Sequence, residues 1–156
     1  MQAMTLPITL TIAGAAALLN IWLGMRVSQL RRLYKVSIGD GGEPALTSRI
    51  RAHANFVEYA PFFLILLALV EMSAGSRAWL WLVAIVFIVG RLMHAFGMDR
   101  PGGNGLRVGG MAATWLTLLG LAIYAICIPY LAGPEREGFE LSPVRSSSLS
   151  GGAKLS

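Results

Sequence analysis

The sequence predicts an all-α integral membrane protein, a four-helix bundle with up-down topology. Apolar residues make up 55% of the 156-residue chain and charged residues only 13%, about half the charged share of an average globular protein. Residues 62–70 and 80–89 are apolar on every side, whereas each helix of a soluble bundle keeps a polar face. Four apolar stretches approach the roughly 20 residues that span a bilayer: residues 6–25, 56–74, 78–96 and 108–131.

The first stretch is expected to be a retained spanning helix and not a signal peptide. No basic residue precedes it, and its apolar run is long for the core of a signal sequence. The short polar segment 73–76 connects the second stretch to the third, and the glycine-rich segment 99–105 connects the third to the fourth. We predict one membrane domain over residues 1–132, followed by a disordered tail over residues 133–156, which is rich in serine, glycine and charge.

The distribution of charge predicts the orientation in the membrane. The net charge of +5 is not interpreted as nucleic-acid binding, because the basic residues gather in loops 26–55 and 97–107. Basic loops of membrane proteins stay in the cytoplasm. We therefore expect both termini on the far side, which is the periplasm if the host membrane is a bacterial inner membrane. The single cysteine, Cys127, excludes an intrachain disulfide, and we predict no metal site.

A polar stripe at the start of the second helix is the strongest functional signal. Arg51, Asn55, Glu58 and Tyr59 are spaced at i, i+4, i+7 and i+8, so they share one face of a helix. Polar groups that lead into a membrane helix are costly unless something binds them. The stripe therefore predicts a ligand site at the mouth of the second span.

Charged residues inside the other spans suggest partners for this stripe. Arg91 lies near the end of the third helix, at a depth similar to that of Glu58, because the two helices are antiparallel. We expect these two residues to pair, directly or through a ligand. His94 lies one turn from Arg91 on the same face. Glu71 is at the opposite end of the second helix, where we expect it to reach water and to have no role in the site.

These residues resemble the signature of the MAPEG family, the membrane-associated proteins in eicosanoid and glutathione metabolism. The resemblance covers about residues 5–131. It includes the second-helix pattern from Arg51 to Pro61 and the sequence Gly90-Arg91-x-x-His94 in the third helix. It also includes the basic segment 31–37 at the end of the first helix and Arg107 at the start of the fourth.

The resemblance implies a homotrimer that binds glutathione, as co-substrate, in a cleft between neighbouring subunits. Lipophilic electrophiles would enter that cleft from the bilayer. Arg107 would be catalytic, because a nearby cation lowers the pKa of a thiol and a helix N-terminus also favours an anion; Arg100 is the reserve candidate. The residues that would hold glutathione are Arg51, Asn55, Glu58, Tyr59, Arg91 and His94, with Arg31 from a neighbouring subunit.

Three departures from the family pattern leave two functions open. Met98 stands where several family enzymes have a tyrosine, Ala54 replaces a basic residue of some members, and residues 108–110 are not polar as they are in the eicosanoid enzymes. These departures argue against prostaglandin E synthase activity. The first hypothesis is a glutathione transferase or peroxidase acting on lipophilic electrophiles. The second, favoured by Met98, is a non-catalytic membrane protein of the same fold that binds a lipid, a thiol or a partner subunit.

Overall fold

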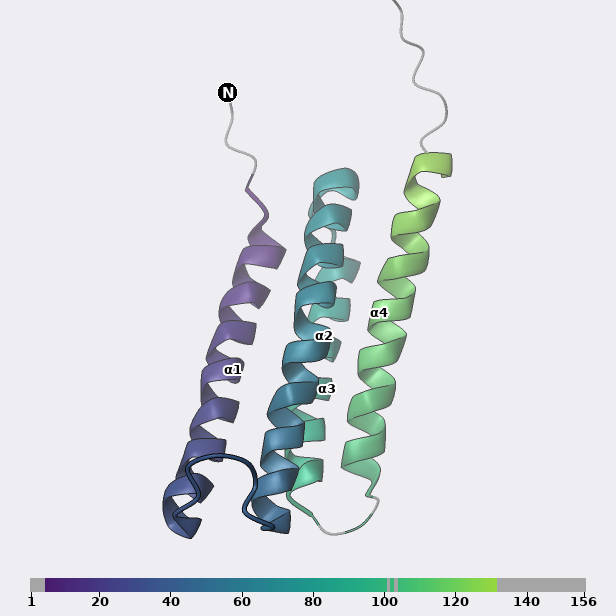
Figure 1. Ribbon diagram of the computed structural model, residues 1–156. Helices are drawn as coiled ribbons and strands as arrows, with labels where there is room; N and C mark the ends of the chain where they lie inside the picture. Colours follow the sequence, from purple (N-terminus) through teal and green to yellow (C-terminus); the bar gives the residue numbers. More distant parts are fainter. Residues whose placement is uncertain (1–4, 101, 103, 132–156) are drawn as a thin grey trace, which may run out of the picture.

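The computed structural model describes residues 5–100, 102 and 104–131, and it contains the four expected helices. Each helix is long and apolar enough to cross a membrane, which confirms the predicted fold class. The tail expected over residues 133–156 lies outside the described residues. The helices are α1 (Pro7–Tyr34), α2 (Pro44–Ala74), α3 (Ala78–Met98) and α4 (Gly105–Leu131), shown in Figure 1.

The chain runs up and down through the bundle. The start of α1, the α2–α3 turn and the end of α4 lie at one end (Figure 1). The α1–α2 and α3–α4 connections lie at the other, which we call the loop end. Helices α1 and α2 are 28 and 31 residues long, well beyond the roughly 20 that a bilayer requires. Their extra turns project polar residues beyond the apolar spans at the loop end.

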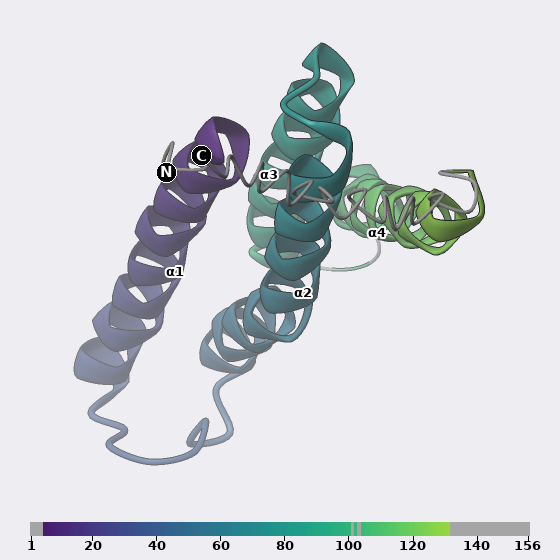
Figure 2. The ribbon, with the colours of Figure 1, turned by 90° about the horizontal axis from the view of Figure 1, so that it is seen from above.

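The bundle is open along one side. Seen from above, α2 and α3 form the centre, with α1 on one flank and α4 on the other (Figure 2). Helix α1 packs on α2 and α3, and α4 packs on α3 and α2, but α1 and α4 do not touch within the described residues. The outer faces carry exposed apolar side chains such as Leu18, Ile65 and Leu116. Such faces suit contact with lipid or with another protein chain.

The core forms where apolar residues recur every three or four positions on facing helices. Phe63 of α2 stacks on Phe87 of α3 with ring centroids 3.8 Å apart and nearly parallel planes. Ile12, Leu67 and Leu121 are buried in the same apolar cluster. Because lipid is as apolar as these side chains, the contact is stabilised mainly by close packing and not by exclusion of water.

Helices α3 and α4 approach each other more closely than side chains would permit. A Cβ atom added at Gly110 would lie 2.5 Å from the carbonyl oxygen of Gly90 and 2.6 Å from the amide nitrogen of His94. One added at Gly97 would lie 2.5 Å from the amide nitrogen of Arg107. Glycine at these positions brings the two backbones into contact, as small residues do in other membrane helices. The first turn of α4, which contains Arg107, therefore lies directly against the last turn of α3.

An ion-pair cluster joins three helices at the loop end. Asp99, just after α3, pairs with Arg26 of α1, and it also accepts a hydrogen bond from Nε of Arg49 on α2 at 3.4 Å. Arg49 donates a second bond, of 3.1 Å, to the carbonyl oxygen of Arg26. The guanidinium of Arg26 lies 4.6 Å from the centre of the Trp22 ring, within the range of a cation–π contact. This cluster fixes α1 and α2 against the end of α3.

The α1–α2 connection is a hydrogen-bonded turn. Lys35 ends α1 in the left-handed conformation, and Gly39, Gly41 and Gly42 also have positive φ, which glycine adopts without strain. The backbone N–H of Gly42 and the hydroxyl of Thr47 donate to the carboxylate of Asp40 and hold its pKa below its ordinary value. These bonds are kept at neutral pH and are lost as the pH falls through the lowered pKa.

Glu71 is buried, and our expectation that it reaches water was wrong. Its side chain is only 2% exposed. The carboxylate accepts hydrogen bonds from the backbone N–H groups of Ile8 and Thr9, at 3.1 and 2.8 Å. The hydroxyls of Thr9 and Ser76 each donate at 2.7 Å. Because α1 begins with no side-chain cap of its own, Glu71 satisfies its first N–H groups from another helix.

We expect Glu71→Gln to destabilise the fold. The neutral amide of glutamine accepts weaker hydrogen bonds than the carboxylate does, and its NH₂ group would face N–H donors. We expect these changes to lower the free energy of unfolding by about 2–3 kcal/mol. Thermal melting in detergent, followed by circular dichroism, measures the effect. Glu58→Gln is the matched control, because Glu58 lies on the same helix and is exposed. Equal melting temperatures for the two variants would contradict the capping role of Glu71.

Candidate functional site

A pocket of about 130 Å³ near the loop end brings the predicted polar residues together. It lies between the first half of α2, the end of α3 and the start of α4. The side chains that line it are Arg51, Ala54, Asn55, Glu58, His94, Met98 and Arg107. Five of the eight residues predicted from the sequence therefore face a single cavity, although they come from three helices.

Helix geometry places the α2 residues on the pocket wall. Arg51, Asn55 and Glu58 lie one turn apart, and Ala54 completes the wall between them. Arg51 and Glu58 are exposed, while Asn55 is half-buried towards α3. The two charged groups are therefore available to a ligand, and the amide between them also contacts the protein interior.

Arg107 is positioned by Asn104 at the start of α4. The Asn104 side-chain oxygen accepts a 3.0 Å hydrogen bond from the Arg107 backbone N–H, as at an N-cap, and its NH₂ group donates a 2.8 Å bond to the carbonyl oxygen of Gly97. These bonds bridge the end of α3 and the start of α4. The exposed Arg107 side chain thus extends from a fixed backbone position, at a helix terminus whose dipole favours anions.

Arg91 lies beneath the pocket, and our expectation of a direct pair with Glu58 was wrong. Its side chain is 1% exposed. One amino group donates a 2.7 Å bond to Oδ1 of Asn55, and the other donates a 3.1 Å bond to the hydroxyl of Thr114. Within the described residues, neither Arg91 nor Glu58 belongs to an ion pair. The physical reason is that Asn55 faces α3, whereas Glu58, almost a turn further along α2, faces outwards.

The other predicted residues occupy different positions. His94 lines the pocket, is 5% exposed, and has no hydrogen-bond partner for Nδ1 in the described structure. Tyr59 lies beside the pocket. Its hydroxyl accepts a 3.2 Å hydrogen bond from the Trp115 indole N–H. The centre of its ring is 6.0 Å from the guanidinium carbon of Arg91.

Arg31 is on α1, where its guanidinium donates a 3.2 Å hydrogen bond to the carbonyl oxygen of Ser37. It does not line the pocket of its own chain.

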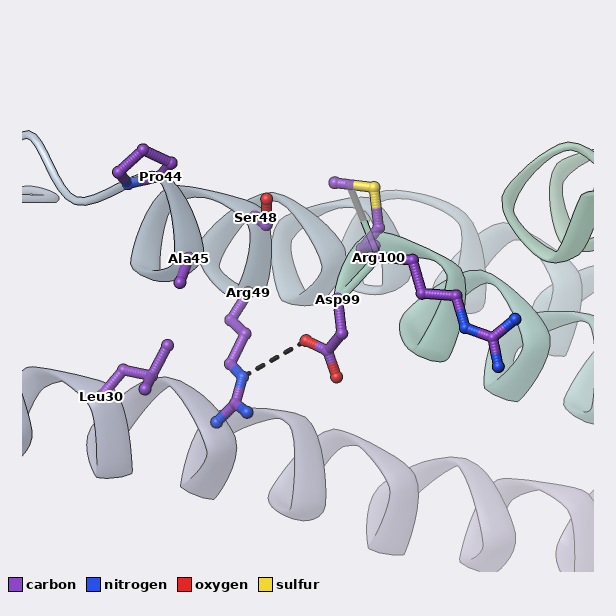
Figure 3. Close-up of a pocket in the computed structure, with 8 residues that line it drawn as sticks. Leu30, Pro44, Ala45, Ser48, Arg49, Asp99 and Arg100 are labelled. Atoms are coloured by element: carbon purple, nitrogen blue, oxygen red, sulfur yellow. Dashed lines mark hydrogen bonds and ion pairs between the residues drawn. The ribbon is translucent and has the colours of Figure 1, made fainter. Parts of the chain in front are cut away.

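A second, larger cavity of about 370 Å³ adjoins the first at the loop end. Figure 3 shows Leu30 of α1 on the side of α2 to which Ala45 and Arg49 point, with Asp99 bonded to Arg49. Arg100, the reserve candidate for catalysis, lines this cavity and points away from the Arg49–Asp99 pair (Figure 3). Met98 lines both cavities. We assign the candidate site to the smaller cavity because its walls combine cations, a carboxylate, an amide and an imidazole.

Two contributors to the site were missed by sequence analysis. Asn104 carries a detectable signal, because an asparagine three residues before Arg107 is a typical helix N-cap. Thr114 carries no such signal, because its contact with Arg91 joins residues that are distant in the sequence. Among the described residues, no group of three or more His, Cys, Asp or Glu side chains could hold a metal ion. The site is suited to a ligand with both anionic and cationic groups.

The fold and the polar pocket together define an integral membrane protein with a polar pocket near one end of its bundle. The model of the MAPEG family matches residues 9–127, and the chain belongs to this family. The inner membrane protein YecN of Escherichia coli strain K12 is 41% identical over 108 residues, which is 69% of this chain and 81% of that relative. The protein of the same name from Escherichia coli O6:H1 strain CFT073 matches equally well.

Proposed function

We propose that this protein uses glutathione as a co-substrate to conjugate or reduce lipophilic electrophiles. The observation that carries the proposal is the convergence of Arg51, Asn55, Glu58, His94 and Arg107 on one pocket of a MAPEG-family chain. The alternative is a non-catalytic protein of the same fold that binds a lipid, a thiol or a partner subunit. It is supported by the thioether of Met98, which offers the pocket no acidic or basic group.

The charges of the pocket complement those of glutathione, which carries two carboxylates and one ammonium. Arginine pairs with carboxylates through two parallel hydrogen bonds, which suits the exposed Arg51 guanidinium. Glu58 is exposed and belongs to no ion pair of the described structure, so its carboxylate is available to the ammonium. These two contacts would orient the tripeptide along the start of α2.

Arg107 would stabilise the glutathione thiolate. A free thiol has a pKa of about 8.5, and a cation beside it lowers that value. The thiol proton would leave to water, and the sulfur would use the freed electron pair to form a C–S bond while a leaving group departs from the electrophilic carbon. With a hydroperoxide, the sulfur would instead take the terminal oxygen and release an alcohol. A second glutathione would then displace water from the sulfenic acid and form the disulfide.

Substitution of the two arginines separates binding from chemistry. Arg51 contacts the ligand in both the ground state and the transition state, so Arg51→Ala should raise KM about tenfold and change kcat less. Arg107→Ala should raise the pKa of the bound thiol towards about 8.5. It should also lower turnover at neutral pH about tenfold, equivalent to about 1.4 kcal/mol. The measurement is the thiolate absorbance of bound glutathione against pH, together with conjugation kinetics.

Arg100→Ala is the matched control for Arg107→Ala. Arg100 is a neighbouring exposed arginine that lines the other cavity. We expect it to leave both the thiol pKa and the turnover unchanged. Coincident titration curves for wild type and Arg107→Ala would remove Arg107 from the mechanism. Failure of the wild-type protein to bind glutathione would leave the non-catalytic alternative in its place.

We also propose that the working form is a homotrimer. Asn20 of α1 bonds to His53 of α2 at 2.9 Å on an exposed face of the bundle. Polar side chains inside a membrane normally face protein or a water-filled cavity. The pocket of about 130 Å³ is open and small for a tripeptide. A neighbouring subunit would cover the Asn20–His53 pair and enlarge the site, to which it would contribute Arg31.

The assembly is measured by native mass spectrometry of the detergent-purified protein. We expect a mass three times that of the chain. Asn20→Leu removes the exposed amide and should weaken the assembly without unfolding the bundle, which circular dichroism checks. A stable wild-type monomer that still binds glutathione would contradict a site shared between subunits.

We further propose that the protein lies in a bacterial inner membrane with its loop end in the cytoplasm. Its relative is named an inner membrane protein, and the arginines of the loop end follow the positive-inside rule. A reporter enzyme that is active only in the periplasm, fused after Ser156, should therefore be active. An inactive fusion, with activity for a cytoplasmic reporter at the same position, would reverse the orientation.

A further inference from the structure

We propose that Thr114 is a positioning residue that acts through Arg91 to fix the side-chain amide of Asn55, so that the pocket offers its ligand a hydrogen-bond donor at that point. This inference rests on the proposed function, because it specifies how the same pocket selects the ligand. The contacts join three helices: Asn55 on α2, Arg91 on α3 and Thr114 on α4. Only Asn55 belongs to the pocket wall.

The chemistry of the three groups determines which way the Asn55 amide faces. A guanidinium has five N–H donors and no acceptor. The atom of Asn55 that lies 2.7 Å from the Arg91 amino group must therefore be the carbonyl oxygen. The NH₂ group of the amide is left on the other side, and it makes no hydrogen bond in the described structure. A ligand in the pocket thus meets two N–H donors of Asn55.

Thr114 is equally restricted in direction. It is fully buried, and its hydroxyl donates to the carbonyl oxygen of Gly110, one turn earlier in α4, at 2.9 Å. Because the hydroxyl proton is directed at Gly110, the oxygen lone pairs remain to accept the bond from Arg91. The hydroxyl and the Asn55 carbonyl are the two side-chain acceptors that hold the Arg91 amino groups.

Burial makes this arrangement stiff. The Arg91 side chain is 1% exposed and has no carboxylate within ion-pair distance in the described structure. A buried cation is costly unless its donors are satisfied, and the Nε of Arg91 already lacks a hydrogen-bond partner in the described structure. Loss of the Thr114 hydroxyl would leave one amino group without its acceptor, and the guanidinium would move to find another. The Asn55 amide, bonded to the same guanidinium, would lose its fixed orientation.

The consequence is selection for a ligand with an acceptor at this point. A carboxylate or a peptide carbonyl would accept hydrogen bonds from the Asn55 NH₂ group, whereas an ammonium or an amide N–H would face a second donor. Glu58, one turn away on the same wall, supplies the acceptor for a cationic group. The two residues would therefore distinguish the anionic and cationic parts of one zwitterionic ligand.

Three substitutions in α4 test the role of Thr114. Thr114→Val keeps the shape and removes the hydroxyl; Thr114→Ser keeps the hydroxyl. Thr117→Val is the matched control, because Thr117 lies one turn later, is also buried, and bonds only to carbonyl oxygens of its own helix. We expect Thr114→Val to raise KM and the Kd for glutathione about tenfold, with kcat and the pKa of the bound thiol unchanged. Thr114→Ser and Thr117→Val should resemble wild type.

Asn55→Asp separates the structural contact from the ligand contact. The aspartate would still accept the bond from Arg91, now as an ion pair, so the melting temperature should be kept or raised. It would present an acceptor and a negative charge to the pocket, so glutathione binding should weaken at least tenfold. Two results would overturn this inference and leave the proposed function standing. One is wild-type affinity of Asn55→Asp for glutathione. The other is an equal KM and Kd for Thr114→Val and Thr117→Val. Wild type that does not bind glutathione would overturn the proposed function and this inference together.

Discussion

The buried guanidinium of Arg91 is the constraint on which the rest of the site depends. A charged group in the interior of a membrane bundle is costly unless other groups pair with it, and the Nε of Arg91 has no hydrogen-bond partner in the described structure. Here the acceptors come from Asn55 on α2 and Thr114 on α4, which fixes both helices against α3 at the depth of the pocket. The contact is possible because Gly90 and Gly110 let α3 and α4 approach backbone to backbone. The small residues therefore serve the polar site as well as the packing.

The fold was predictable because its signal is local. Four long apolar stretches and short connections suffice for a membrane bundle, although α1 and α2 extend well beyond the apolar residues on which the prediction rests. The openness of the bundle was not predictable, since nothing in the apolar pattern indicates that α1 and α4 do not touch. Helix packing in lipid depends on the shapes of small residues and not on an apolar stripe, so hydropathy carries little information about it.

The candidate site was predictable where its residues share one helix or a family pattern. Arg51, Asn55 and Glu58 follow from helical spacing, and His94 and Arg107 from the resemblance. The contacts between helices were not predictable, and the expected direct pair of Arg91 with Glu58 was wrong. Similar depth suggested that Arg91 meets Glu58, but depth does not fix the rotation of a helix about its axis. Asn55, a turn earlier, faces Arg91 instead. Opposite charge alone is a weak guide to pairing when neutral acceptors lie closer.

The two glutamates of α2 show how hydrogen bonding distinguishes a structural group from one available to a ligand. Glu71 lies in the last turn of α2, whereas Glu58 lies near the middle of the helix. Glu71 accepts four hydrogen bonds from Ile8, Thr9 and Ser76, so its acceptor capacity is largely used within the fold. Glu58 accepts none within the described structure and lies open on the pocket wall. An exposed carboxylate on a pocket wall is free to bind the cationic group of a ligand. The exposed carboxylate, and not the buried one, is therefore the one available to a ligand.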